Sequence, residues 1–133
     1  GDLDQKNVLW DASGQPLLID WESARKLNPT YEIVLAALDW SGVTSEYNHG
    51  LCRKIMSAYR KAGGVFESEM LEAALHYVMG EWVYWLIYNI ARAVDPNREL
   101  RELGGEQIEL VLPTIFRLKT LKSELLSMWR DER

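Results

Sequence analysis

Residues 1–22 read GDLDQKNVLWDASGQPLLIDWE, and this stretch decides the expected fold. Two short apolar runs, Val8-Leu9-Trp10 and Leu17-Leu18-Ile19, flank the segment DASGQP at residues 11–16. Runs this short favour β-strands over a helix. The segment between them has turn chemistry, since glycine permits positive φ, proline fixes φ, and aspartate and serine form local hydrogen bonds. We therefore expect a β-hairpin here.

After this hairpin the hydrophobic pattern becomes helical. Apolar residues recur at helical spacing over residues 32–40, and again from residue 44 or 45 to residue 62. Gly63-Gly64 then gives a stop signal. The pattern predicts two helices in this part of the chain.

A long third helix is expected from Ser68, a good N-cap residue, to Ala93 or Val94. It is apolar almost all round, which predicts a central helix that is covered on several sides. A short helical piece over residues 98–103 should end at Gly104-Gly105, and Pro113 should kink the last helix or divide it in two. The expected class is mainly α (α+β), with a short β-hairpin leading into a helical bundle.

Three polar residues around the hairpin carry chemistry: Asp2, Asn7 and Asp20. An aspartate, an asparagine five residues later, and a second aspartate after a hairpin form the phosphoryl-transfer arrangement of protein-kinase-like enzymes. One aspartate orients the acceptor hydroxyl, while the asparagine and the second aspartate supply the oxygen ligands that Mg²⁺ prefers. Each signal alone is weak, but their order and spacing favour a kinase over coincidental turn residues.

The segment GDLDQKNVLW followed by LLIDWE resembles the aminoglycoside phosphotransferase family, which includes choline, thiamine and homoserine kinase relatives. In those enzymes the catalytic loop begins with a His-Gly-Asp-Leu motif. The aspartate that binds the metal lies in an Ile-Asp-Trp-Glu or Ile-Asp-Phe-Gly motif. NPTYEIVLA (residues 28–36) resembles the family's next segment. The resemblance implies that Asp2 is the catalytic base, that Asn7 and Asp20 hold Mg²⁺, that ATP is the co-substrate, and that Glu32 supports the loop from below.

The same resemblance implies one domain over residues 1–133, the C-terminal lobe of a protein-kinase-like fold. Residues 1–31 would form the catalytic loop and metal-binding hairpin, and residues 32–133 the helical substrate-binding part. The motif histidine and the ATP-binding N-terminal lobe are absent from the chain, which we therefore expect to be inactive alone. Asp4 and Lys6 stand where many relatives have histidine and glycine.

The phosphate acceptor is expected to be a small hydroxyl-bearing, cationic molecule. Glu81, Trp82 and Trp85 are the candidate substrate residues, because aromatic rings and carboxylates recognise ammonium groups. A wider set of the same residue types is considered with them: Trp40, Tyr84, Tyr88, Glu46, Glu67 and Glu69. Helical spacing favours a packed core over a cation-binding cage for the aromatic residues, and a solvated face accounts for most of the acids. The net charge of −5 is compatible with a cationic substrate.

Charge and composition also bear on partners and compartment. The negative charge disfavours nucleic-acid binding, and no apolar run reaches the length of a membrane span. One cysteine, Cys52, indicates a reducing compartment, so we expect a cytoplasmic protein. The alternative function is a non-catalytic helical interaction module.

A homodimer is also expected. The apolar side chains of Leu3, Val8, Trp10 and Leu18 would lack the cover of an N-terminal lobe, and exposed patches of this kind tend to find a partner.

Overall fold

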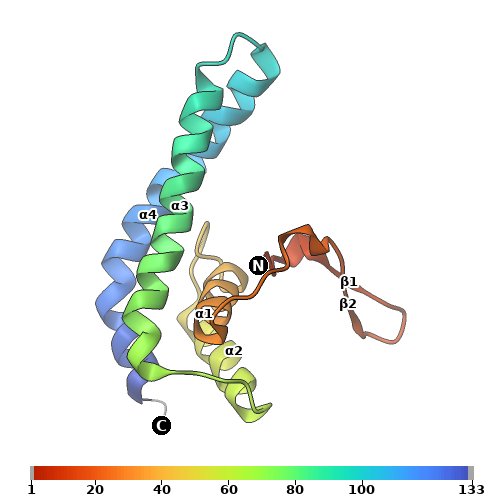
Figure 1. Ribbon diagram of the computed structural model, residues 1–133, viewed down its shortest axis with the longest axis vertical. Helices are drawn as coiled ribbons and strands as arrows, with labels where there is room; N and C mark the ends of the chain where they lie inside the picture. The colour runs from red at the N-terminus through yellow and green to blue at the C-terminus, as the bar shows by residue number, and fades with distance from the viewer. Residues whose placement is uncertain (1, 132–133) are drawn as a thin grey trace.

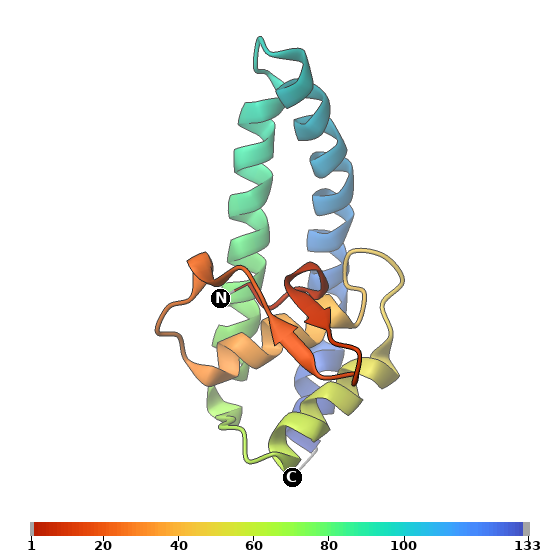
Figure 2. The ribbon, with the colours of Figure 1, turned by 90° about the vertical axis from the view of Figure 1, so that its right-hand side faces the viewer.

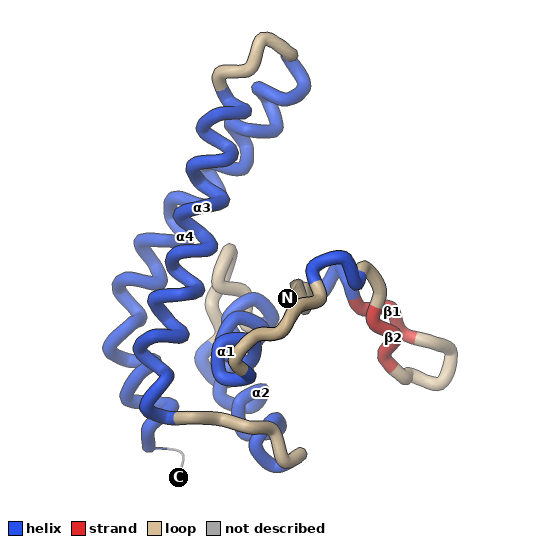
Figure 3. Tube along the Cα trace, in the orientation of Figure 1, coloured by secondary structure: helices blue, strands red, loops and turns tan. Residues whose placement is uncertain are grey.

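The computed structural model describes residues 2–131, and its helices and strands confirm a mainly helical chain that follows a short hairpin (Figures 1 and 3). In chain order they are a 3-10 turn Gln5–Asn7, β1 (Val8–Trp10), β2 (Pro16–Leu18), a 3-10 turn Trp21–Ser23, α1 (Pro29–Trp40), α2 (His49–Lys61), a 3-10 turn Ser68–Met70, α3 (Leu71–Ala93) and α4 (Arg98–Asp131). α3 and α4 form a long antiparallel pair that projects beyond the other elements, while α1 and α2 lie against its base (Figure 1).

The hairpin forms where the sequence predicts it, with Val8 paired to Leu18 and Trp10 to Pro16. The second strand therefore begins one residue earlier than predicted. Asp11 organises the turn, because its carboxylate accepts hydrogen bonds from the backbone N–H groups of Ser13 and Gln15, each at 2.8 Å. The turn also contains Gly14, at φ 79°, a conformation that glycine adopts without steric cost.

Asparagine caps set where α1 and α2 begin, and both differ from the prediction. Asn28 accepts a hydrogen bond from the Thr30 N–H at 2.8 Å, so α1 begins at Pro29 rather than at residue 32. Asn48 accepts one from the Leu51 N–H at 2.9 Å, so α2 begins at His49 rather than at residue 44 or 45. The cap fixes the start more strongly than the apolar pattern does.

The start of α3 also differs from the prediction. Ser68 lies in a 3-10 turn and gives no side-chain cap to α3, which begins at Leu71. The prediction of a helix covered on several sides holds for its first two turns, where Leu71, Leu75 and Val78 are buried. It is wrong for the second half, where Ile87 is 61% exposed and Tyr84 71%.

α4 is one helix of 34 residues, so the predicted end at Gly104-Gly105 and the predicted division in two at Pro113 are wrong. Gly104 does not end the helix, and its small size instead allows α4 to pack closely against α3. A Cβ there would lie 2.5 Å from the backbone N of Ala93 and 2.8 Å from the carbonyl O of Asn89, so the glycine lets α4 pass close to α3. Proline removes one backbone hydrogen bond, and at Pro113 the helix continues without it.

The core lies at the base of the molecule, where α1, α2, the first half of α3 and the second half of α4 meet (Figure 2). Its largest fully buried side chains are Trp129, Leu38, Met56, Leu71, Leu75, Leu118 and Leu125. Hydrogen bonds at Trp40, the last residue of α1, join the chain start to this base, where the candidate site lies. Over residues 2–131, none of the helices has an apolar stretch long enough to cross a membrane.

Candidate active site

The loop before the hairpin is held by the end of α1. The indole N–H of Trp40 donates to the Leu3 carbonyl at 2.8 Å, and the Gln5 side chain donates to the Trp40 carbonyl at 3.5 Å. The loop closes on itself through a hydrogen bond from the Asn7 N–H to the Asp4 carbonyl at 3.0 Å. A packed helix therefore fixes the position of the loop.

Asn7 is the buried centre of this loop, with 5% of its surface exposed. Its side-chain Nδ2 donates to the Asp2 carbonyl at 2.9 Å and to Asp2 Oδ2 at 3.1 Å. The asparagine thus orients the Asp2 carboxylate. Because the amide nitrogen is used in these bonds, the amide oxygen is the atom of Asn7 that could bind a metal.

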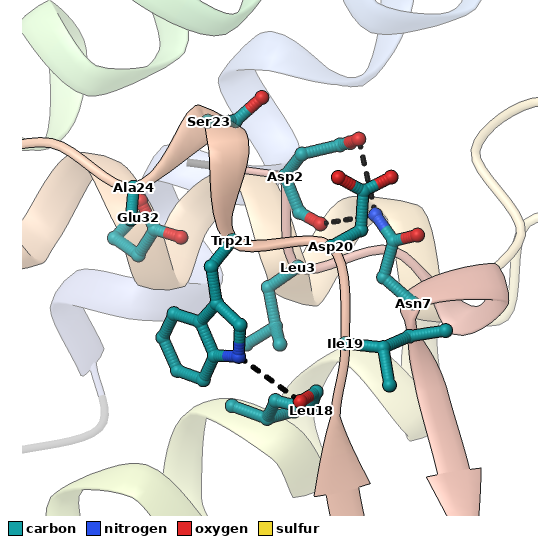
Figure 4. Close-up of a pocket in the computed structure, with 10 residues that line it drawn as sticks. All are labelled: Asp2, Leu3, Asn7, Leu18, Ile19, Asp20, Trp21, Ser23, Ala24 and Glu32. Atoms are coloured by element: carbon teal, nitrogen blue, oxygen red, sulfur yellow. Dashed lines mark hydrogen bonds between the residues drawn. The ribbon is translucent and has the colours of Figure 1, made fainter.

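Asp20 is brought to the same place by the hairpin. The Ile19 N–H donates to the Asn7 carbonyl at 2.9 Å, which sets the residue before Asp20 directly beside the loop. Asp20 adopts φ 59° and ψ 66°, a left-handed conformation that costs free energy for a residue other than glycine. In Figure 4 its carboxylate lies with the Asp2 carboxylate and the Asn7 amide. Strained backbone of this kind is concentrated at functional sites.

These three side chains and Glu32 line one small cavity of about 150 Å³ (Figure 4). The sequence-predicted catalytic, metal and support residues are therefore brought together. Within residues 2–131 no cluster of three or more His, Cys, Asp or Glu is arranged for a metal ion. The arrangement suits Mg²⁺ nonetheless, because that ion uses one or two carboxylates and completes its shell with water and phosphate oxygens.

A larger cleft of about 600 Å³ adjoins this cavity, and Asp2, Ser23 and Ala24 line both. The three candidate substrate residues belong to its lining, which is Asp2, Asp4, Lys6, Glu22, Ser23, Ala24, Arg25, Leu35, Asp39, Thr44, Glu81, Trp82, Tyr84 and Trp85. Other aromatic and acidic residues considered from the sequence lie outside this lining: Trp40, Tyr88, Glu46, Glu67 and Glu69.

The candidate substrate residues already have contacts with other residues of the chain. Glu81 lies 3.9 Å from Arg25, and the Trp85 indole donates to Gln107 at 3.2 Å. Trp82 is half-buried and packs against the core, so both interpretations of the aromatic residues apply in part. The side chains form a wall with defined positions, which is what a selective binding cleft needs.

Asp39 is the residue of this cleft that the sequence interpretation missed. It is half-buried in the last turn of α1, and burial raises the pKa of its carboxyl to about 7, with further increases from the charges of Asp4 and Asp2. Lys6 opposes the shift and also lies 3.4 Å from Asp4. A signal was available, because an acid in the last turn of an apolar helix is unfavourable beside the negative end of the helix dipole.

An oriented carboxylate, Asp2, lines both the small cavity that contains Asn7 and Asp20 and the larger cleft that contains acidic and aromatic side chains. Such an arrangement can hold a divalent cation on one side of the carboxylate and a cationic small molecule on the other. Comparisons of the chain with protein-family models, with curated proteins and with solved structures gave no match.

Proposed function

We propose that this chain is the catalytic and acceptor-binding lobe of a small-molecule kinase of the aminoglycoside phosphotransferase and choline kinase type. The main support for this proposal is that Asp2 lines both cavities. The smaller one contains Asn7 and Asp20, and the larger cleft contains Glu81 and Trp82. A phosphotransferase needs its base between the metal-bound phosphate and the acceptor hydroxyl. The family resemblance and the position of Asp2 in both linings support this role for Asp2.

The proposed reaction moves one phosphoryl group from ATP to an acceptor hydroxyl. The hydroxyl proton passes to an Asp2 carboxylate oxygen as the acceptor oxygen bonds to the γ-phosphorus, and the bond from that phosphorus to the β–γ bridging oxygen of ATP breaks to leave ADP. Asn7 orients Asp2 through its two hydrogen bonds. Asn7 and Asp20 would hold Mg²⁺, which neutralises charge on the phosphate oxygens.

The charges of the larger cleft favour a cationic acceptor. Its lining carries carboxyl groups from Asp2, Asp4, Glu22, Asp39 and Glu81. Lys6 and Arg25 are the two basic residues in that lining, and each already lies beside an acid. An amine-bearing acceptor would complement the excess of carboxyl groups and could place its ammonium group over an indole ring.

The metal site is tested on the chain as it stands, with Mn²⁺ as a paramagnetic probe for Mg²⁺. Low concentrations of Mn²⁺ should broaden the backbone amide signals of Asn7, Asp20 and their neighbours. Asp20→Asn should abolish that selective broadening, whereas Glu109→Gln, which changes an exposed acid on α4, should leave it unchanged. Equal broadening in native protein and Asp20→Asn would remove Asp20 from the metal site.

Catalysis would be tested in a protein in which an ATP-binding lobe precedes Gly1, as the proposal requires. The present chain alone should not phosphorylate any acceptor. With that lobe, Asp2→Ala should lower kcat by orders of magnitude with little change in nucleotide affinity, because Asp2 acts on the acceptor proton. A gene whose upstream sequence lacks a glycine-rich loop and a Val-Ala-x-Lys-like strand would contradict the proposal.

One observation favours the alternative, a non-catalytic helical interaction module. The second half of α3 and its C-cap expose large apolar side chains, among them Ile87 and Val94, which line neither cavity. A module of this kind would not bind Mn²⁺ selectively at Asp20. The paramagnetic experiment therefore distinguishes the two functions.

A further inference from the structure

The second half of α3, together with its C-cap residue Val94, carries an aliphatic stripe that faces away from the rest of the chain. Its members are exposed by 42% at Val83, 61% at Ile87, 49% at Ile90 and 78% at Val94. No charged residue occurs from Trp82 to Ala91. We name these four residues the α3 stripe. A helix surface that is apolar, exposed and without charge is typical of an interaction site.

The spacing of the α3 stripe identifies the kind of partner that fits it. The four residues follow at intervals of four, three and four, which is the seam pattern of a helix packed along another helix. Gly80 lies on the same face one turn before Val83. Apart from the residues next to Gly80 and the backbone of its own helix, no described atom lies within 4 Å of where a Cβ at Gly80 would stand, so no other part of the chain fills that space.

The order of residues in the α3 stripe selects a second copy of the same chain. Read in either direction the stripe is Val, Ile, Ile, Val, with the same intervals. A two-fold axis between residues 88 and 89 would therefore place Val83 opposite Val94 of the other copy, and Ile87 opposite Ile90. Symmetric pairs need a self-complementary surface, and an antiparallel pairing of this stripe provides one.

We propose that the chain forms an antiparallel homodimer through the α3 stripe. The paired α3 helices would lie at the centre and each α4 outside, as in a four-helix bundle. Both copies contribute uncharged side chains, so no charge is desolvated at the seam. The arrangement leaves the two cavities near Asp2 outside the interface, and it does not depend on the proposed kinase activity.

This interface differs from the dimer expected from the sequence. That expectation used the apolar surface around the hairpin, but Val8 is buried within its own chain, with 8% exposed. Leu3 and Leu18 line the small cavity. Leu9 and Trp10 do remain exposed, by 51% and 61%, so the hairpin supplies a matched control.

Light scattering and sedimentation test the proposal. Native chain at micromolar concentration should have twice the 15.4 kDa monomer mass. Ile87→Asp with Ile90→Asp places like charges across the seam and should weaken dimerisation by about 100-fold or more. Leu9→Asp should leave it unchanged. Circular dichroism checks that each variant is folded, which is expected because all three positions are exposed in the monomer.

Cysteine crosslinking tests the direction of the pairing without disturbing the seam. A mixture of Val83→Cys and Val94→Cys chains should give mixed disulfide dimers, whereas Val83→Cys alone should not link to itself. In the antiparallel pair two copies of residue 83 are offset by about 16 Å along the helix axis, which is too far for a disulfide. Cys52 is fully buried and native chain provides the background.

Each result decides the proposal. A monomeric native chain, or a dimer that persists in Ile87→Asp with Ile90→Asp, would overturn it. Loss of the dimer in Leu9→Asp would return the interface to the hairpin. Efficient linking of Val83→Cys to itself would show a parallel pair and contradict the antiparallel arrangement.

Discussion

The two ends of the α3–α4 pair are held together in different ways. At the base, large side chains such as Leu75, Leu118 and Leu125 are fully buried between the helices and α1. At the tip, the two backbones approach closely at Gly104, and the buried side chain beside it is the polar Asn89. The Asn89 amide donates to the Trp85 carbonyl at 2.8 Å, so it is satisfied within its own helix.

This difference shows that α3 can contribute to the core at its base and to a surface at its tip. At the base, apolar side chains of α3 and α4 are used for the core of the fold. The tip joins its helices through a small residue, which leaves the aliphatic side chains of α3 pointing outward. Stability should therefore be concentrated at the base, and surface interactions at the tip.

The largest expected effect comes from matched substitutions on α4. Leu125→Ala removes a fully buried side chain at the base and should lower the free energy of unfolding by about 2–5 kcal/mol. Leu112→Ala changes a side chain that is 43% exposed nearer the tip and should cost roughly 0.5 kcal/mol. Urea denaturation measures both. Equal costs would show that the tip is packed as tightly as the base.

The close approach at the tip can be broken directly. Gly104→Ala would place a Cβ 2.5 Å from backbone atoms of α3, so the helices must separate or shift. We expect a loss of about 1–3 kcal/mol, as for an overpacked core. Thermal unfolding gives the measurement, and a variant as stable as native protein would mean that the helices are not in contact there.

Asp39 tests the boundary between the core and the cleft. Its pKa is raised from 3.8 to about 7 by burial, so the folded protein binds a proton there that the unfolded chain releases at lower pH. Its contribution to stability is therefore present at acid pH and is lost as the pH rises through about 7. Asp39→Asn should be the more stable protein above that pH, by on the order of 2 kcal/mol.

Denaturation curves for native protein and Asp39→Asn, recorded from acid pH to above about 7, give the difference in the free energy of unfolding directly. Glu109→Gln, at an exposed position, is the control and should follow the native curve. A difference between Asp39→Asn and native protein that does not change with pH would contradict the raised pKa.

The smallest effect is expected at the glycine next to the close approach. A Cβ at Gly105 meets no described atom within 4 Å, so Gly105→Ala gains helix propensity without a clash. It should raise the free energy of unfolding by roughly 0.5–1 kcal/mol. Adjacent glycines with effects of opposite sign would confirm that the contact at the tip is limited to one face of α4.

Much of the fold could be predicted from local signals. The hairpin follows from DASGQP at residues 11–16, and it forms within one residue of the prediction. The helical period that predicts a helix from Ser68 to Ala93 or Val94 is similarly informative, because α3 spans residues 71–93. The periods of apolar residues in strands and helices are local properties of the sequence, so they can be recognised without knowing how the rest of the chain folds.

Errors arose where a residue type has two possible roles. Gly104-Gly105 predicts a helix stop, but the small size of Gly104 serves a close contact with Asn89, which is distant in sequence. In the candidate site, Asp2, Asn7, Asp20 and Glu32 were found by motif and do meet in one cavity. Asp39 was missed because its importance comes from burial and from neighbouring charges, which no motif encodes.

The Trp40 indole proton, which is hydrogen-bonded to the Leu3 carbonyl, can be followed individually by hydrogen exchange. Hydrogen exchange at that indole would report each opening of the loop from α1, while backbone amides inside α1 report unfolding of the base. If both exchange at the same rate, the loop has no motion of its own and Asp2 keeps its position for as long as the protein stays folded. A faster indole would make loop opening a separate, measurable equilibrium of the proposed catalytic site.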